Sequence, residues 1–162
     1  MAKEVEEREN FISEKDADTF RNVMDNYFNL EDKRCFHHRT TQVIDCMYIH
    51  DIPEVDELGL KLKKLAKERN EKYTINYFQI VKWPEHSNQG EHIDFDYHPY
   101  STILYLNDDF DGGETVVGDE IIYPKKCKLI GFEGNRITHK VNHITKGTRY
   151  TIPCWYKYES KF

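Results

Sequence analysis

The feature of this chain that most constrains its fold is a change of hydrophobic period at Tyr73. Before Tyr73 the apolar residues recur at helical spacing, and after it they alternate along short segments separated by turn residues. The first segment, residues 73–83, is predicted to be a long strand that ends at Pro84. Six alternate residues are expected on one face of it: Tyr73, Ile75, Tyr77, Gln79, Val81 and Trp83. Shorter strands are predicted at residues 91–97, 102–107, 114–117, 120–123, 126–132, 137–141 and 149–158.

Two helices are expected ahead of these strands. Ser13 followed by Asp16 supplies an acceptor and an acid suited to a helix start. The apolar stripe of this first helix comprises Phe20, Val23, Met24, Tyr27 and Phe28. A second helix is predicted to begin near Asp51, with Pro53 in its first turn, and to stop at Asn70. Its buried line comprises Val55, Leu58, Leu62 and Leu65.

Short strands after a pair of helices predict a mainly β fold, a double-sheet jelly roll supported by two or more N-terminal helices on one face. The 162 residues suit one domain over 1–162, with helical support over about 1–70 and a β core over about 73–158. Pro153 interrupts the last strand and implies a bulge or a sheet edge there. The polar segments 84–91 and 108–113 are candidates for lids over a site.

Charge and composition exclude several classes of protein. The formal net charge is −6 with a pI near 5.8, and no basic stripe marks a nucleic-acid surface. No apolar stretch is long enough to span a bilayer and the start does not resemble a signal peptide, so we expect a soluble cytoplasmic or otherwise intracellular protein. The four cysteines are expected to be reduced and to pack as small hydrophobes, with a bridge between the first two as the alternative: Cys35, Cys46, Cys127 and Cys154.

Two histidines and one carboxylate, His92, Asp94 and His139, form a candidate metal triad. Such a set suits ferrous iron and leaves coordination positions open for oxygen chemistry. Residues two apart on a strand project to the same side, so His92 and Asp94 are expected to point together into a barrel mouth, with His139 arriving from another strand. Asp96 competes for the carboxylate role, and His143 competes with His139. The other histidines are predicted to be ordinary solvated residues: His37, His38, His50, His86 and His98.

Further segments accompany this triad in a fixed order: residues 9–13, His92-Ile93-Asp94, residues 102–107, Gly112-Gly113-Glu114-Thr115, His139-Lys140-Val141 and residues 146–150. In this order they resemble the motifs of the prolyl 4-hydroxylase-like 2-oxoglutarate and iron(II)-dependent dioxygenases. The resemblance implies a double-stranded β-helix, iron bound by His92, Asp94 and His139, 2-oxoglutarate as cosubstrate, dioxygen as oxidant and ascorbate as a reductant. It further implies release of succinate and carbon dioxide as an unactivated carbon is hydroxylated.

The resemblance also assigns residues around the cosubstrate. Arg149 matches the basic residue that binds the distal carboxylate of 2-oxoglutarate, in agreement with the planar donor fork of a guanidinium. Tyr105 matches a tyrosine of the cosubstrate pocket and Trp155 an active-site tryptophan, although either also suits a core. Thr115 is expected to pack in the core with a minor cosubstrate role, and Trp83 to wall the site where relatives carry tyrosine.

The substrate implied by the resemblance is a prolyl residue in a peptide or protein. Gln89 and Pro99 stand where relatives carry other residues near the substrate, so the substrate is less firmly indicated than the reaction. Two alternatives are an AlkB-like nucleic-acid demethylase, which the acidic balance disfavours, and a noncatalytic cupin-like metal-binding barrel, which would not need Arg149. We expect no nucleic-acid or membrane partner, and the oligomeric state stays open.

Overall fold

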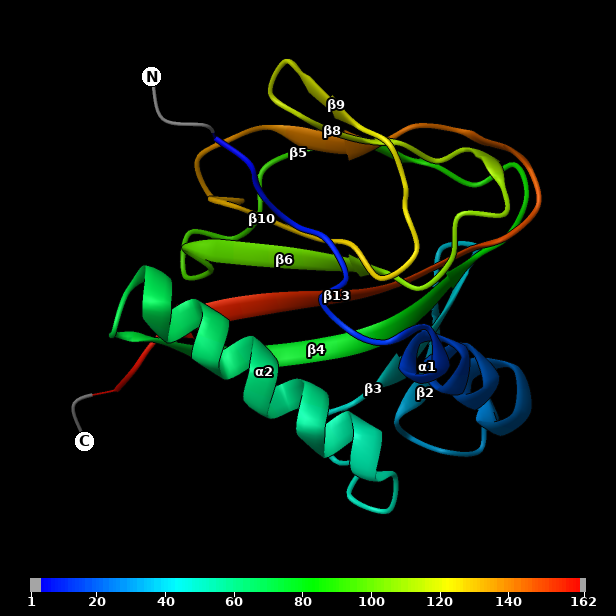
Figure 1. Cartoon of the computed structure of the whole chain (residues 1–162). Coiled ribbons are helices and arrows are strands. Elements are labelled where there is room, and N and C mark those ends of the chain that lie inside the picture. The colour runs from blue at the N-terminus through cyan, green and yellow to red at the C-terminus, as the bar shows by residue number, and fades with distance from the viewer. Residues whose placement is uncertain (1–3, 161–162) are drawn as a thin grey trace.

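Two facing antiparallel sheets dominate the computed structural model, which describes residues 4–160 (Figure 1). The larger sheet has seven strands in the order β1 (Glu6–Arg8), β10 (Leu129–Phe132), β6 (Tyr100–Tyr105), β13 (Arg149–Tyr158), β4 (Tyr73–Trp83), β3 (Thr41–Asp45) and β2 (Cys35–His38). The smaller sheet has four strands in the order β5 (Gln89–His92), β11 (His139–Val141), β8 (Thr115–Val117) and β9 (Glu120–Ile122). A two-stranded pair is formed by β7 (Asp111–Gly112) and β12 (Ile144–Lys146). The expected double-sheet β fold is confirmed.

Both helices cover the outer face of the larger sheet, away from the smaller one (Figure 1). They are α1 (Glu14–Tyr27) and α2 (Pro53–Arg69). The Ser13 hydroxyl accepts a hydrogen bond from the backbone N–H of Asp16 at 3.1 Å, which confirms the predicted cap of α1. The backbone N–H of Asn70 donates a hydrogen bond to the Ala66 carbonyl at the end of α2, which agrees with the predicted stop.

Alternation along the central strands divides the interior into two cores. The even-numbered residues of β13, such as Ile152 and Cys154, join the core under the helices. On the opposite face, Tyr105, Ile130 and Phe132 belong to the smaller core between the sheets. The remaining space between the sheets is therefore bounded on one side by the odd-numbered residues of β13.

The predicted single face of β4 is wrong for its first two members. The cross-strand register changes at Asn76: Trp155 pairs with Tyr77, whereas the next residue, Tyr156, pairs with Ile75. Asn76 is the extra residue of a β-bulge, and such a residue reverses the facing of the strand beyond it. Ile75, together with Tyr73, consequently packs with the core under the helices.

Two other strand predictions also need correction. Pro153 lies in a central strand, paired with Ile103 of β6, so it marks no edge, and the irregularity of β13 falls between Trp155 and Tyr156. The strand expected over residues 91–97 ends at His92 as β5, and the chain beyond it is a loop. The hairpin formed by β2 and β3 was not predicted.

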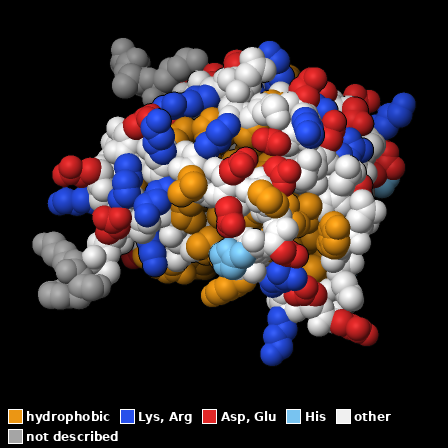
Figure 2. Space-filling model, turned by 60° about the horizontal axis from the view of Figure 1, so that its bottom comes forward, with side chains coloured by type: hydrophobic (Ala, Val, Ile, Leu, Met, Phe, Trp, Pro, Cys, Tyr) orange, Lys and Arg blue, Asp and Glu red, His pale blue; other side chains and the backbone are white. Residues whose placement is uncertain are grey.

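Several expectations concern the molecule as a whole. All four cysteines are free and buried, as predicted, without a bridge between Cys35 and Cys46. Over residues 4–160, neither helix has the length and apolar character needed to cross a membrane. Figure 2 shows the helical side of the molecule, where charged side chains of both signs are interspersed with hydrophobic ones.

Candidate functional site

His92 and His139 are brought together by the pairing of two strands of the smaller sheet. The register of β5 and β11 places these residues directly opposite each other, and their ring centroids are 4.2 Å apart. The Nδ1 atom of His92 lies 2.9 Å from the Gly90 carbonyl, and that of His139 lies 2.9 Å from the Ile137 carbonyl. Because a carbonyl can only accept, each Nδ1 carries the proton and each Nε2 is left as a free electron-pair donor.

Asp94 reaches the same point from the loop after β5, and not from a strand as the sequence predicted. Its backbone N–H donates to the Gly134 carbonyl at 2.9 Å, and its Oδ2 accepts from the Ser101 hydroxyl at 2.7 Å. A Cβ at position 134 would lie 2.1 Å from Asp94 Oδ2, so only glycine leaves room for the carboxylate. Sequence reasoning missed Ser101 and Gly134, because neither carries a metal-ligand group.

The three side chains converge on one small volume. Asp94 Oδ1 lies 3.1 Å from His139 Nε2 and 3.6 Å from His92 Nε2, and one ligand atom from each residue lies within 4.8 Å of the others. Burial tends to raise the pKa of Asp94, but the adjacent His139 ring and the hydrogen bond from the Ser101 hydroxyl lower it overall. The carboxylate is therefore ionised, and two neutral imidazoles with one carboxylate fit a ferrous ion.

The competing residues lie elsewhere. Asp96 and His143 are exposed, and His143 packs near His86 with a ring-centroid distance of 6.1 Å. His98 corrects the prediction of a solvated residue: it is 1% exposed, and its Nε2 lies 2.8 Å from the amide nitrogen of Asn76. The bulge of β4 thus supplies the partner that holds His98 beside the site. His37, His38, His50 and His86 are exposed, and of these His38 lines the central cavity.

Arg149 is a buried cation without a buried anion. It begins β13 opposite Trp83, is 1% exposed, and its Cζ lies 4.9 Å from the centre of the Trp83 ring. Its Nε donates to the Gly113 carbonyl and its terminal nitrogen to the Thr115 hydroxyl, each at 3.1 Å. Burial lowers the pKa of this guanidinium, and no carboxylate within residues 4–160 forms an ion pair with it. A buried charge of this kind calls for an anionic ligand.

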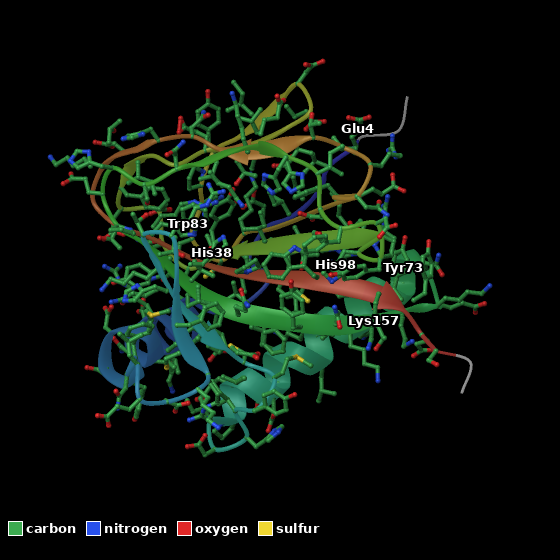
Figure 3. The ribbon with its side chains drawn as sticks, turned by 180° about the vertical axis from the view of Figure 1, so that it is seen from behind. Glu4, His38, Tyr73, Trp83, His98 and Lys157 are labelled. Carbon is green, nitrogen blue, oxygen red and sulfur yellow. The ribbon has the colours of Figure 1, made fainter. Side chains whose placement is uncertain are left out.

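One cavity of about 420 Å³ between the two sheets joins Arg149 to the His92, Asp94 and His139 set. Figure 3 shows Trp83 and His38 at one end of the space between the sheets, with His98 farther along it. Trp83 lines this cavity, and its indole N–H is buried without a hydrogen-bond partner. An orphaned donor and an unpaired guanidinium in one cavity fit a ligand that carries carboxylate oxygens.

The remaining predicted residues also border this cavity or support it. The Thr115 hydroxyl lines it and lies 2.5 Å from the hydroxyl of Tyr105, which is fully buried behind it. Trp155 lines the cavity from the same strand face as Arg149, and its ring centre lies 4.8 Å from that of Tyr77. The unpredicted β2–β3 hairpin adds further lining residues: Phe36, His38, Arg39 and Thr41.

Comparison with known proteins agrees with this donor set. Residues 78–157 match the model of the 2OG-Fe(II) oxygenase superfamily, and this segment contains His92, Asp94, His139 and Arg149. The match confirms, over this segment, the family resemblance that the ordered motifs predicted. That class uses 2-oxoglutarate and Fe(II), and the two groups fit the Arg149 end of the cavity and the end lined by His92, Asp94 and His139.

Individual relatives point to prolyl hydroxylases. Mouse prolyl 3-hydroxylase 2 is 34% identical over 70 residues, a match that covers 38% of this chain and 10% of that protein's length. The fold is similar to that of viral collagen prolyl hydroxylase vCPH from Paramecium Bursaria Chlorella virus-1, with a TM-score of 0.79, 16% identity and 98% coverage of both chains. It is also similar to a Trichoplax adhaerens prolyl hydroxylase in complex with a hypoxia inducible factor peptide fragment, with a TM-score of 0.78, 18% identity, and 95% and 83% coverage.

Proposed function

We propose that this chain is a 2-oxoglutarate and Fe(II)-dependent dioxygenase, folded as one domain, that hydroxylates a prolyl residue in a peptide or protein. The observation that carries the proposal is Arg149, a buried guanidinium without an anionic partner, in the same cavity as a two-histidine, one-carboxylate set. A structural metal site would need only the ligand set. A cosubstrate with two carboxylates needs both ends of the cavity.

In this proposal His92, Asp94 and His139 hold the iron, which with 2-oxoglutarate and dioxygen supplies the oxidising chemistry. Ser101 keeps Asp94 aimed at the metal through a hydrogen bond to Oδ2, and this leaves Oδ1 as the ligand atom. The two backbone carbonyls that accept from Nδ1 of the histidines fix each Nε2 toward the same point. The residues of the chain thus supply position and charge.

Arg149 would bind the distal carboxylate of 2-oxoglutarate with its planar fork of donors. The hydroxyls of Thr115 and Tyr105 lie beside that fork and hold its orientation, because Thr115 accepts from Arg149. Trp83 lies on one face of the guanidinium and offers its free indole N–H to a cosubstrate oxygen. Together with Trp155, it would keep water from the reacting centre.

A prolyl substrate is supported by the relatives and by the aromatic lining of the cavity. Flat aromatic rings, among them those of Tyr77 and Trp155, suit a pyrrolidine ring and the extended polyproline conformation that displays it. Four buried free thiols also fit a reducing intracellular compartment.

The test is a turnover assay with Fe(II), 2-oxoglutarate and ascorbate on proline-rich peptides, free proline and methylated nucleic acid. We expect a mass gain of one oxygen on a peptide, matched by stoichiometric succinate. Oxidation of free proline or nucleic acid alone would refute the prolyl-peptide substrate and leave the dioxygenase activity standing. No 2-oxoglutarate-dependent oxidation of any class, from protein that holds Fe(II), would refute the enzyme itself.

The matched variant for this assay is Arg149→Ala. Removal of a charge-assisted bidentate partner from a buried carboxylate costs on the order of 2 to 5 kcal/mol. The apparent affinity for 2-oxoglutarate should fall by at least about 30-fold, with iron content unchanged. Loss of iron together with cosubstrate would instead assign Arg149 a structural role.

A further inference from the structure

Asn107 is a buried amide whose place in the fold links it to Arg149. It follows β6 after one residue, is 3% exposed, and does not line the cavity. The register of β6 and β13 pairs Tyr105 with Thr151, and its continuation by two residues places Asn107 opposite Arg149. The amide therefore lies beside the backbone that carries the guanidinium.

The Asn107 side chain hydrogen-bonds the peptide groups on both sides of Arg149. Its Oδ1 accepts from the Tyr150 N–H at 2.8 Å, and its Nδ2 donates to the Thr148 carbonyl at 2.8 Å. The orientation of the amide follows from chemistry, because a backbone N–H can only donate and a carbonyl can only accept. The ladder's neighbouring backbone bond, from the Leu106 N–H to the Tyr150 carbonyl, is 3.0 Å long. One side chain thus extends the ladder between β6 and β13 beyond the end of β6.

A second contact holds the amide itself. Asn107 Nδ2 also donates to Asp109 Oδ1 at 2.6 Å, and Asp109 lies 3.4 Å from a guanidinium nitrogen of Arg21 on α1. Burial tends to raise the pKa of Asp109, but the hydrogen bond from Asn107 and the charge of Arg21 lower it overall, so the acceptor is ionised at neutral pH. The chain from α1 through Asp109 to Asn107 ends at the backbone of Arg149.

We propose that Asn107 is a positioning residue for cosubstrate binding: it fixes the backbone on both sides of Arg149 so that the guanidinium meets the distal carboxylate of 2-oxoglutarate. This inference rests on the role proposed for Arg149. The fork of Arg149 is already held from its side-chain end by Gly113 and Thr115, so a shift of its backbone would tilt the fork away from the carboxylate. Bidentate recognition is sensitive to such a tilt.

The test is calorimetric titration of 2-oxoglutarate into protein loaded with Mn(II) without oxygen, which measures binding apart from turnover. The test variant is Asn107→Ala, and the matched control is Asn29→Ala, which removes an amide that accepts from the Glu31 N–H in an exposed turn. Pyruvate is titrated in parallel, because it carries the 2-oxo acid group but has no distal carboxylate. We expect Asn107→Ala to weaken 2-oxoglutarate binding by about tenfold, the size of two lost buried hydrogen bonds. Pyruvate and Mn(II) affinities should change by less than about twofold.

A second variant keeps the inference testable if Asn107→Ala does not fold. Asp109→Ala removes an acid whose side chain is 65% exposed, so its folding should be preserved, and it should weaken 2-oxoglutarate binding by about two- to threefold. Unchanged 2-oxoglutarate affinity in Asp109→Ala and in folded Asn107→Ala would overturn the inference, and so would an equal loss of 2-oxoglutarate and pyruvate. Wild-type protein that binds Mn(II) but not 2-oxoglutarate would overturn the proposed function as well, whereas tight wild-type binding confines any failure to Asn107.

Discussion

At the scale of single residues, the tautomers of the two site histidines are set by very short-range contacts. Each imidazole donates through Nδ1 to a carbonyl two residues earlier in its own chain segment, Gly90 for His92 and Ile137 for His139. No distant partner is needed to present Nε2. The tautomer that leaves Nε2 free on both side chains is therefore set by the local backbone, and strand pairing brings the two rings together.

The proposed iron ligands can be separated from their competitors by one pair of variants. His139→Ala removes a donor that lies 3.1 Å from Asp94 Oδ1, so it should lower iron affinity and turnover by about 100-fold or more. His143→Ala changes an exposed ring and should leave both within about twofold of wild type. Metal content after gel filtration and initial rates of succinate release give the two readouts. Normal iron in His139→Ala with loss in His143→Ala would reverse the assignment.

At the scale of elements, the sequence predicted best where the period of a strand is unbroken. Arg149, Pro153 and Trp155 share one parity on β13, and all three line the cavity. The bulge at Asn76 could not be predicted, because an inserted residue leaves the hydrophobic alternation intact while it reverses one part of the strand. The β2–β3 hairpin was missed for another reason: its turn contains Arg39 at a φ of 56° where glycine or asparagine would be the usual signal.

The connection between β7 and β8 depends on Gly113. Its φ is +68°, and a Cβ there would lie 2.8 Å from the Phe110 ring and 3.2 Å from Arg149 Cδ. Gly113→Ala should therefore destabilise the protein by about 1 to 3 kcal/mol and weaken 2-oxoglutarate binding through Arg149. Gly90→Ala is the control, because a Cβ there would meet nothing within 4 Å.

Urea unfolding at neutral pH measures both glycine variants. The free energy of unfolding of Gly90→Ala should lie within about 1 kcal/mol of the wild-type value, above or below it. Equal unfolding midpoints for Gly113→Ala and wild type would show that the loop relaxes around the added methyl group.

At the scale of the whole molecule, the helices are tied to the sheet by charged contacts as well as by the core. Asp25 of α1 accepts from Lys82 of β4 at 3.0 Å and from the Tyr150 hydroxyl at 2.8 Å. The order of helices and strands was predictable from the sequence, but these contacts were not, because their partners are 57 and 125 residues apart. For the same reason, the contacts that connect α1 through Asp109 and Asn107 to the backbone of Arg149 could be seen only in the structure.

Acid should weaken the contacts of Asp25 with Lys82 and Tyr150 in a defined pH range. Burial tends to raise the pKa of Asp25, but hydrogen bonds from Tyr150 and Lys82 lower it overall. Since the unfolded chain then binds more protons than the folded one, the stabilisation is complete above the ordinary carboxyl pKa of about 3.9 and is lost as pH falls through the lower folded value. Asp25→Asn should cost less than about 1 kcal/mol at pH 7, because the pair is partly solvated, and nothing at the lowest pH. A constant difference in unfolding free energy from pH 7 to pH 2 would contradict this assignment.

Ligand binding should be visible as stability of the whole fold, because His92 and His139 belong to the smaller sheet and Arg149 to the larger one. Mn(II) with 2-oxoglutarate at about 100 times its dissociation constant should add about 2.7 kcal/mol to the free energy of unfolding. For a chain of 162 residues this is a rise in Tm of about 5 to 10 °C, which a chelator should reverse. Asp94→Ala should lose the metal-dependent shift, whereas Arg149→Ala should keep the shift caused by metal alone and lose the further rise caused by 2-oxoglutarate. A full 2-oxoglutarate shift in Arg149→Ala would place the distal carboxylate elsewhere in the cavity.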